Sequence, residues 1–394
     1  MSKVHPIVFI AHGLFGVYSI EFGVVGILPV ITQRFDVSAS QAGLLVGLFA
    51  LVVAGAGPFM VLLMSRFNRK RILTVSLLIF AASSVLSAYA TNYTVLTLSR
   101  IIPALFHPVY FSFAFVAAAS LYPRHQSTQA SAKAFVGTSM GMVLGIPITT
   151  WIAARVSYEA SFLFSAIVNL IAAAGIVAKL PDDGRANRIS YGRQLAILRK
   201  VPLWLNIAAS TAIFGAMFSV YSYSAEYLRL EAHMSGELIS VVLVIFGVGG
   251  VSGNLLAGKL LAKNKVRTTI LHPLLLGGAY SILYFFCTSS LLPMIVIALL
   301  WGAIHTSGLI VTQVWLTSEA SEAPEFATGI YISFINLGVV LGATSGGWFL
   351  ANMGIQGTIW SGLLFAAVAL AFIGLKVVLY GDAQEEIDLS NAVR

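Results

Sequence analysis

Long apolar runs without a period of two dominate this chain and decide what it can fold into. One example is LLVGLFALVVAGAG at residues 44–57. A bilayer-crossing helix needs about 20 mostly apolar residues, whereas outer-membrane strands alternate in polarity and span about ten. The sequence contains twelve stretches of the helical kind: 6–31, 42–64, 72–90, 94–121, 130–154, 160–180, 203–228, 238–262, 268–288, 291–316, 326–351 and 356–380. We therefore expect an all-α integral membrane protein with twelve transmembrane helices.

The composition excludes the other broad classes of protein. Hydrophobic residues make up 58% and charged residues 10% of the chain, against about 25% charged residues in soluble domains. The one cysteine, Cys287, rules out an intramolecular disulfide. The net charge of +8 lies in short clusters between apolar stretches, so it does not indicate nucleic-acid binding. No zinc spacing, phosphate-binding loop or hydrolase elbow is present, and we expect neither an enzyme nor a metal or cofactor site.

Lysine and arginine residues predict the orientation in the membrane. If the N-terminus is cytoplasmic, 19 of the 23 lysine and arginine residues lie on the cytoplasmic side and three on the opposite side. Arg100 lies inside a span. Cytoplasmic loops of membrane proteins carry this excess of positive charge. The first apolar run is too long for a signal peptide and is expected to remain as the first helix. Both termini are therefore expected in the cytoplasm.

The chain carries an internal repeat. Gly137, Gly141 and Gly145 recur 201 residues later as Gly338, Gly342 and Gly346, and His107 recurs 198 residues later as His305. Basic loops also follow the second and eighth spans. The repeat predicts two pseudo-symmetric six-helix bundles, 1–180 and 203–394, joined by a cytoplasmic linker at 181–202. Parallel repeats of six spans are typical of the major facilitator fold, with the substrate site near the midplane between the halves.

Five segments carry a more specific resemblance: EFGVVGILPVITQRFDVSASQAGLLVGLFAL, LSRIIPALFHPVYFSFAFVAA, GTSMGMVLGIP, GNLLAGKLLAKNKVR and WGAIHTSGLIVTQVWL. The chain resembles 12-span drug:proton antiporter-type exporters of the major facilitator superfamily, in the branch with arabinose and purine-nucleoside efflux proteins. The loop after the second span departs from the family pattern, because Val61, Ser65 and Asn68 replace its Gly, Asp and Gly. Pro103 and Ala104 replace Gln and Gly in the fourth span. The resemblance implies export coupled to protons.

Glu21 is the one acidic residue deep inside a span. Intramembrane carboxyl groups are costly and by default indicate a functional site. Arg100, in the fourth span, is within reach of Glu21 if both long side chains extend toward each other. We expect the two residues to form an ion pair that takes part in proton coupling, with a static structural pair as the alternative.

Aromatic and polar side chains in the central spans predict the substrate cavity. Histidine titrates near neutral pH, and two histidines at repeat-related positions strengthen the interpretation. Packing alone is the alternative for each residue. The predicted cavity residues are Tyr18, Phe22, His107, Tyr110, Tyr221, Trp301, His305 and Asn336.

Two further groups have structural roles. The glycines of the repeat, together with Pro147, are expected to let helices approach closely. Arg66, Arg69 and Lys70 fix topology, and the family resemblance adds a cytoplasmic gate role that the missing loop acid weakens.

The sequence thus predicts a proton-coupled antiporter that exports a small organic solute or drug by alternating access. The expected setting is a bacterial cytoplasmic membrane, and a monomer suffices because one chain contains both halves of a pathway. Its partners would be the solute, protons and lipid, with no nucleic acid. The main alternative is a proton-independent facilitator or importer of a sugar or nucleoside on the same fold; a channel and an intramembrane enzyme are the remaining alternatives.

Overall fold

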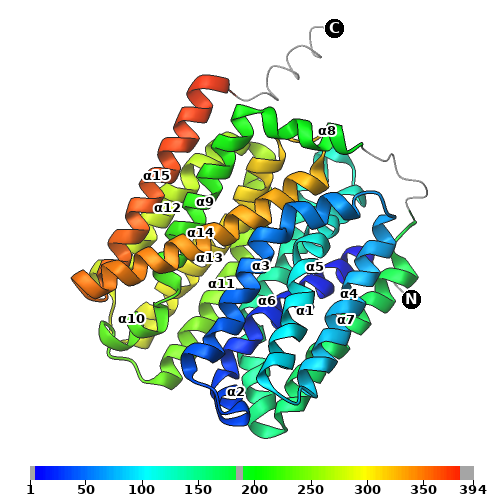
Figure 1. Cartoon of the computed structure of the whole chain (residues 1–394). Helices are drawn as coiled ribbons and strands as arrows, with labels where there is room; N and C mark the ends of the chain where they lie inside the picture. The colour runs from blue at the N-terminus through cyan, green and yellow to red at the C-terminus, as the bar shows by residue number, and fades with distance from the viewer. Residues whose placement is uncertain (1–4, 183–189, 382–394) are drawn as a thin grey trace. The chain divides into compact units, whose positions relative to one another are not determined.

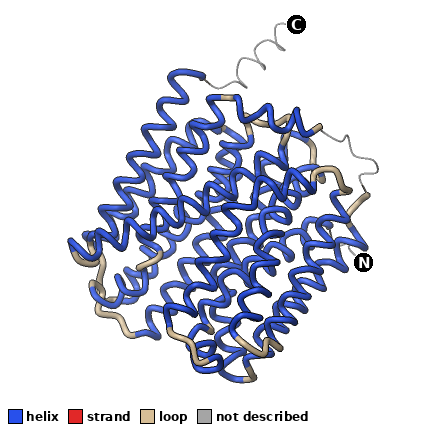
Figure 2. The backbone as a smooth tube through the Cα atoms, in the orientation of Figure 1, coloured by secondary structure: helices blue, strands red, loops and turns tan. Residues whose placement is uncertain are grey.

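The structure is a computed structural model that describes residues 5–182 and 190–381. In this part of the chain every regular element is a helix, as Figure 2 shows. Twelve helical segments are long and apolar enough to cross a membrane within the described residues. The predicted all-α architecture with twelve spans is confirmed. Residues 183–189 of the predicted linker, and most of the C-terminal tail, lie outside the described residues.

Packing divides the chain into two compact units. The first consists of residues up to Tyr191 together with Thr328–Ser333. Its helices are α1 (Pro6–Gly26), α2 (Leu28–Phe35), α3 (Ala39–Met64), α4 (Arg69–Ala88), α5 (Tyr93–Ser120), α6 (Ser127–Arg155) and α7 (Tyr158–Lys179), with a 3₁₀ turn at Arg124–Gln126. Within this unit α1 packs on α6 and α7, α4 packs on α5 and α7, and α3 packs on α5 (Figure 1).

The second unit comprises Gly192–Ala327 and the residues from Phe334 onward. Its helices are α9 (Val201–Tyr221), α10 (Ser224–Leu230), α11 (Gly236–Lys263), α12 (Lys265–Phe286), α13 (Leu291–Thr317), α14 (Pro324–Met353) and α15 (Gly357–Tyr380). The short helix α8 (Tyr191–Ala196) and a 3₁₀ turn at Ile197–Arg199 precede them. Here α11 packs on α13, α9 packs on α15, and α12 packs on both α13 and α15 (Figure 1).

Two predicted spans are interrupted. The first ends at Gly26, where the Ile27 amide donates to the Val24 carbonyl, and the separate helix α2 begins at Leu28 with Pro29 in its first turn. Proline has no amide hydrogen and fits the first turn of a helix, so the chain restarts there. The seventh span breaks between Tyr221 and Ser224. Apolar content does not reveal such breaks, because they depend on which local hydrogen bonds the backbone makes.

The repeat is visible in the helix caps. Asn68 precedes α4 and accepts a hydrogen bond from the Arg71 amide at 3.1 Å. Asn264 precedes α12 and accepts one from the Arg267 amide at 2.7 Å. An asparagine side chain at this position satisfies an amide that the helix leaves unpaired. Each basic loop is therefore also a helix start, at corresponding places in the two units.

The glycine ladders bring helices into backbone contact. Gly137, Gly141 and Gly145 lie against Ala11, Phe15 and Ser19 of α1. Their repeat-related counterparts, Gly338, Gly342 and Gly346, lie against Thr211, Gly215 and Ser219 of α9. Small residues allow this close approach. Pro147 does not take part as predicted, because it is exposed; two residues beyond Gly145, it points to another side of the helix.

We expect Gly137→Ala to lower the free energy of unfolding by about 1–3 kcal/mol, because its Cβ would overlap the Ala11 carbonyl oxygen. Gly47→Ala is the matched control, since no heavy atom lies within 4 Å of the added Cβ. Alanine also favours the helix by about 1 kcal/mol. Thermal unfolding midpoints in detergent would test this, and equal midpoints for the two variants would contradict the packing assignment.

Candidate functional site

A carboxylate and an imidazole meet inside the first unit. Glu21 on α1 and His107 on α5 approach with Oε2 and Nε2 3.1 Å apart, and His107 is 1% exposed. Arg100, Ala104, His107 and Phe111 recur on one buried face of α5, as the helical repeat dictates. Asn92 caps the start of this helix through the Val95 amide. The sequence pattern of α5 thus carries His107 to Glu21.

The pair is close but not hydrogen-bonded. The Glu21 Oε2 atom and both His107 ring nitrogens lack a hydrogen-bond partner, although the ion-pair distance is short. The distance is the firmer observation, because a small rotation of either side chain would align the two groups. Buried polar atoms are nearly always paired.

Arg100 does not meet Glu21 as the sequence predicted. Its guanidinium donates to the backbone carbonyls of Leu45, Ile20 and Glu21 at 3.5, 3.2 and 3.4 Å. No ion pair within 4 Å joins it to the carboxylate of Glu21, a residue that the structure describes in full. The reason is the direction of the side chain: the guanidinium reaches the backbone of Glu21, whereas the carboxylate extends toward His107. His107 is therefore the group that faces the carboxylate.

Aromatic rings surround the imidazole of His107. The ring centroids of Tyr18, Phe49 and Phe111 lie 5.4, 5.8 and 6.2 Å from it. Phe22 stacks on Tyr18 at 5.9 Å. Tyr110, also predicted to line the cavity, is fully buried and its hydroxyl donates to the Ile10 carbonyl. These rings exclude water from the pair, which strengthens any electrostatic interaction within it.

A second aromatic cluster surrounds His305 in the second unit. The rings of Tyr221, Phe246, Phe218 and Trp301 have centroids 5.1, 5.2, 6.0 and 6.3 Å from the imidazole. Trp301 Nε1 and both His305 nitrogens are buried without a hydrogen-bond partner. Asn336 is buried on α14 of the same unit. Three predicted cavity residues, Tyr221, Trp301 and His305, thus come together here.

The predicted cytoplasmic gate residues have contacts that the sequence did not reveal. The guanidinium of Arg66 lies 3.8 Å from the ring centroid of Tyr191, at the start of α8. Asn68 donates to the Asp182 carboxylate at 2.6 Å. Arg69 and Lys70 form the first turn of α4. An acid from the beginning of the linker therefore reaches the loop in which Ser65 replaces the family's acid. The gate role itself stays a prediction.

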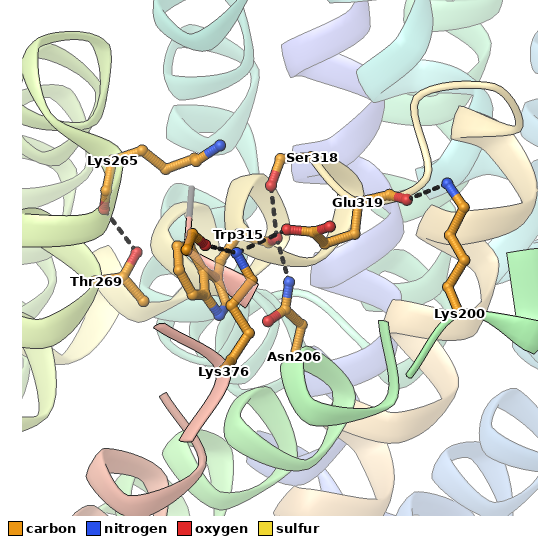
Figure 3. A network of polar contacts seen from close by, with 9 residues as sticks. Lys200, Asn206, Lys265, Thr269, Trp315, Ser318, Glu319 and Lys376 are labelled. Atoms are coloured by element: carbon orange, nitrogen blue, oxygen red, sulfur yellow. Dashed lines mark hydrogen bonds and ion pairs between the residues drawn. The ribbon is translucent and has the colours of Figure 1, made fainter. Parts of the chain in front are cut away.

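Sequence reasoning missed a buried charge in the second unit. Lys376 on α15 is 1% exposed, and its ammonium lies 2.8 Å from Glu319 Oε1 and donates to the Gly381 carbonyl. Figure 3 shows Lys376 beside the Trp315 ring, with its ammonium close to Glu319 just after α13. The only signal of it in the sequence is a lysine inside an apolar stretch.

A second lysine approaches Glu319 from the start of α9. Lys200 donates to the Glu319 backbone carbonyl at 2.8 Å (Figure 3). Its ammonium also pairs with the Glu322 carboxylate. Partial burial raises the pKa of the Glu322 carboxyl, but its contacts with Lys200 outweigh burial and hold that pKa below its usual value. A carboxyl pKa that is lower in the folded state stabilises that state at neutral pH. This contribution is lost as the pH falls through the lowered pKa.

Comparison with known proteins gives one family. A sequence profile of the Major Facilitator Superfamily matches residues 10–324 and 227–390. The chain is 32% identical over 374 residues to the "Inner membrane transport protein YdhP" of Escherichia coli (strain K12), covering 95% of this chain and 96% of that protein. It is 26% identical to a "Probable sugar efflux transporter" of Mannheimia succiniciproducens, covering 95% and 94%.

Solved structures show the same fold. The fucose:proton symporter FucP of E. coli superposes with a TM-score of 0.73 at 17% identity, covering 95% of this chain and 99% of that one. The human organic anion transporter MFSD10 gives 0.73 at 14% identity, covering 94% and 98%. At these identities the likeness concerns the fold alone.

Proposed function

Because this chain belongs to the Major Facilitator Superfamily, a family of transporters rather than enzymes, we propose that it exports a small organic solute in exchange for protons. The proposed setting is the cytoplasmic membrane of a bacterium, with both termini in the cytoplasm. The superposed transporters support the fold and do not specify the solute or the coupling ion.

The observation that carries the proposal is the buried Glu21–His107 pair. It joins an acid and a base in an apolar surrounding of the first unit. A carboxylate held inside a membrane span needs a function or a partner to offset its cost. The Glu21 carboxylate has such a partner in the His107 imidazole, 3.1 Å away. Such a pair can gain or lose one proton without unfolding its surroundings.

The pair couples transport through its net charge. The pair is neutral overall when an ionised Glu21 faces a protonated His107, and also when both groups are neutral. One further proton gives the pair a single positive charge. The fixed guanidinium of Arg100 nearby disfavours that charge and helps release the proton. Binding and release of this proton therefore stabilise different conformations to different degrees. Solute and proton need not touch, because each shifts the same conformational equilibrium.

For the solute, sugars are the first candidates. One curated relative is named a sugar efflux transporter, and aromatic residues surround His305 in the second unit. A proton-independent facilitator or importer of a sugar or nucleoside remains the alternative on the same fold. The two differ in energetics: an antiporter moves solute uphill when a pH gradient is imposed, and a facilitator does not.

The experiment uses purified protein in liposomes that contain a pH-sensitive dye. A proton gradient is imposed, and L-arabinose, lactose, inosine and cationic dyes are added one at a time. We expect at least one solute to trigger a proton flux that protein-free liposomes do not show. A protonophore should abolish uphill movement of that solute. Solute movement that leaves the dye signal unchanged, and that ignores the protonophore, would replace antiport with facilitation.

A further inference from the structure

A small cavity lies between α1, α6 and α7 of the first unit. Its volume is about 10 Å³, which is about the least space that one bound water molecule requires. All of the residues that line it are buried. Four of them carry a hydroxyl group: Ser19 on α1, Thr149 on α6, and Ser161 and Ser165 on α7. The cavity is therefore closed and polar, although it lies inside an apolar helix bundle.

The sequence explains why space remains between these helices. Ser19 and Gly23 lie one turn apart on α1, and Ser161 and Ser165 lie one turn apart on α7. Residues at this spacing share one face of a helix. Serine and glycine side chains are too short to fill the gap between facing helices, so a cavity is left where the two small faces meet.

The hydroxyl groups of the cavity are in two different states. Ser19 Oγ is buried and has no hydrogen-bond partner. Thr149 donates its hydrogen to backbone carbonyls of α1 and α6 at 2.9 and 2.6 Å, and Ser161 donates to the Tyr158 carbonyl at 2.6 Å. A hydroxyl group has one hydrogen and two lone pairs. Ser19 can therefore still donate, whereas Thr149 and Ser161 can only accept.

An unpaired hydroxyl group is not by itself evidence of a ligand. Ser76 Oγ on α4 is also buried without a partner, and Ser76 does not line this cavity. Ser19 differs because free space and two hydroxyl oxygens that can accept line the same cavity. Ordered water commonly satisfies buried polar groups in such surroundings.

The chemistry of the cavity excludes small ions as its occupant. A chloride ion only accepts hydrogen bonds, so it could not use the oxygens of Thr149 and Ser161. A sodium ion would find no acidic residue in the lining. It would also lie near a fixed positive charge, because the Arg100 guanidinium donates at 3.2 Å to the carbonyl of Ile20, another lining residue. A buried cation without a counter-charge is costly.

We propose that this cavity binds a single water molecule. The water accepts a hydrogen bond from Ser19 and donates one each to Thr149 and Ser161, and three hydrogen bonds are typical of a buried water. It thus joins α1 to α6 and α7 in the last two turns before α1 ends at Gly26. The inference is independent of the proposed antiport, because Glu21 is not among the lining residues.

Thermal unfolding of two serine variants in detergent tests the hydrogen bond to Ser19. We expect Ser19→Ala to lower the unfolding midpoint by about 2–4 °C, because the water loses a partner. Ser76→Ala is the matched control, since both hydroxyl groups belong to serines that are at most 1% exposed. This control should leave the midpoint unchanged or raise it, because it removes a hydroxyl group that is not satisfied.

A high-resolution density map of the purified full chain tests occupancy directly. One sample contains sodium chloride, and in the other choline replaces sodium. We expect a density peak in both samples, about 2.5–3.0 Å from the hydroxyl oxygens of Ser19, Thr149 and Ser161. The variant Ser19→Val should lack the peak, because its methyl groups fill the cavity and it cannot donate.

Three results would overturn the inference. The first is a cavity without density in the original protein. The second is a peak that is present only with sodium, which would assign the site to a cation. The third is a Ser19→Ala variant that is no less stable than Ser76→Ala, which would mean that the Ser19 hydroxyl group has no ligand.

Discussion

Glu21→Gln is expected to abolish uphill transport while solute exchange continues. The amide has nearly the size of the carboxylic acid, keeps a polar contact for His107, and cannot exchange a proton. With one pH unit imposed across the membrane, each exchanged proton can sustain a concentration ratio of about tenfold. The variant should reach a ratio of about one, because its conformational equilibrium no longer depends on the proton gradient.

Liposomes loaded with a radiolabelled solute give this ratio at steady state. Glu226→Gln is the matched control, since Glu226 is another glutamate in a spanning segment but pairs with Arg229 at an exposed position. This control variant should reach the same steady-state concentration ratio of solute as the original protein. If Glu21→Gln still sustained a tenfold ratio, the carboxyl group would be structural, and the proton would have to reside elsewhere.

Lys376→Ala is expected to destabilise the protein by about 3–5 kcal/mol. The change leaves the Glu319 carboxylate, 11% exposed, without its closest cation. It also removes the ammonium of Lys376 from the Trp315 ring, whose centroid lies 4.6 Å away (Figure 3). Breaking a buried pair from one side costs more than replacing both partners, because the remaining charge stays desolvated. The combination Lys376→Met with Glu319→Gln should therefore recover most of the loss.

Thermal unfolding midpoints in detergent measure this prediction. Lys263→Ala supplies the control, because Lys263 is an exposed lysine near the end of α11, and should leave the midpoint unchanged. A double variant less stable than Lys376→Ala would contradict the interpretation. That order would mean that Glu319 is stabilised by Lys200 and needs no contribution from Lys376.

The fold could be predicted from the sequence because a membrane span is a length of apolar residues. The twelve spans and the two-bundle fold, confirmed by the structure and the family match, follow from that rule and from the glycine repeat. The breaks after Gly26 and Tyr221 did not follow. They depend on which local hydrogen bonds the backbone makes, and apolar content carries no information about those bonds.

Partners inside the bundles were harder to predict than the spans. Glu21 was identified from its depth, but its contact is His107 rather than Arg100. Two residues in different helices meet only if both depth and rotation agree, and sequence gives the depth of each to within a few residues. Lys376 was misread for a related reason: composition shows that a lysine lies in a helix, not that Glu319 turns inward to meet it.

The repeat carries more information about the site than either half alone. Aligning His107 with His305 shows where the halves differ, at Glu21 and Tyr221 and at Arg100 and Ala298. The contacts place Glu21 beside His107 and Tyr221 beside His305.

We propose that solute binding drives a proton from the Glu21–His107 pair. Purified protein in a weakly buffered detergent solution, titrated with a solute that it binds, reports this directly through a pH dye. Reciprocal coupling requires that a solute which displaces the proton also binds more tightly as pH rises. We predict that proton release approaches one per bound solute at a pH where the free protein holds the proton and the solute-bound protein does not, and that Glu21→Gln releases none. Saturable solute binding with no proton release from the original protein at any pH would contradict the account.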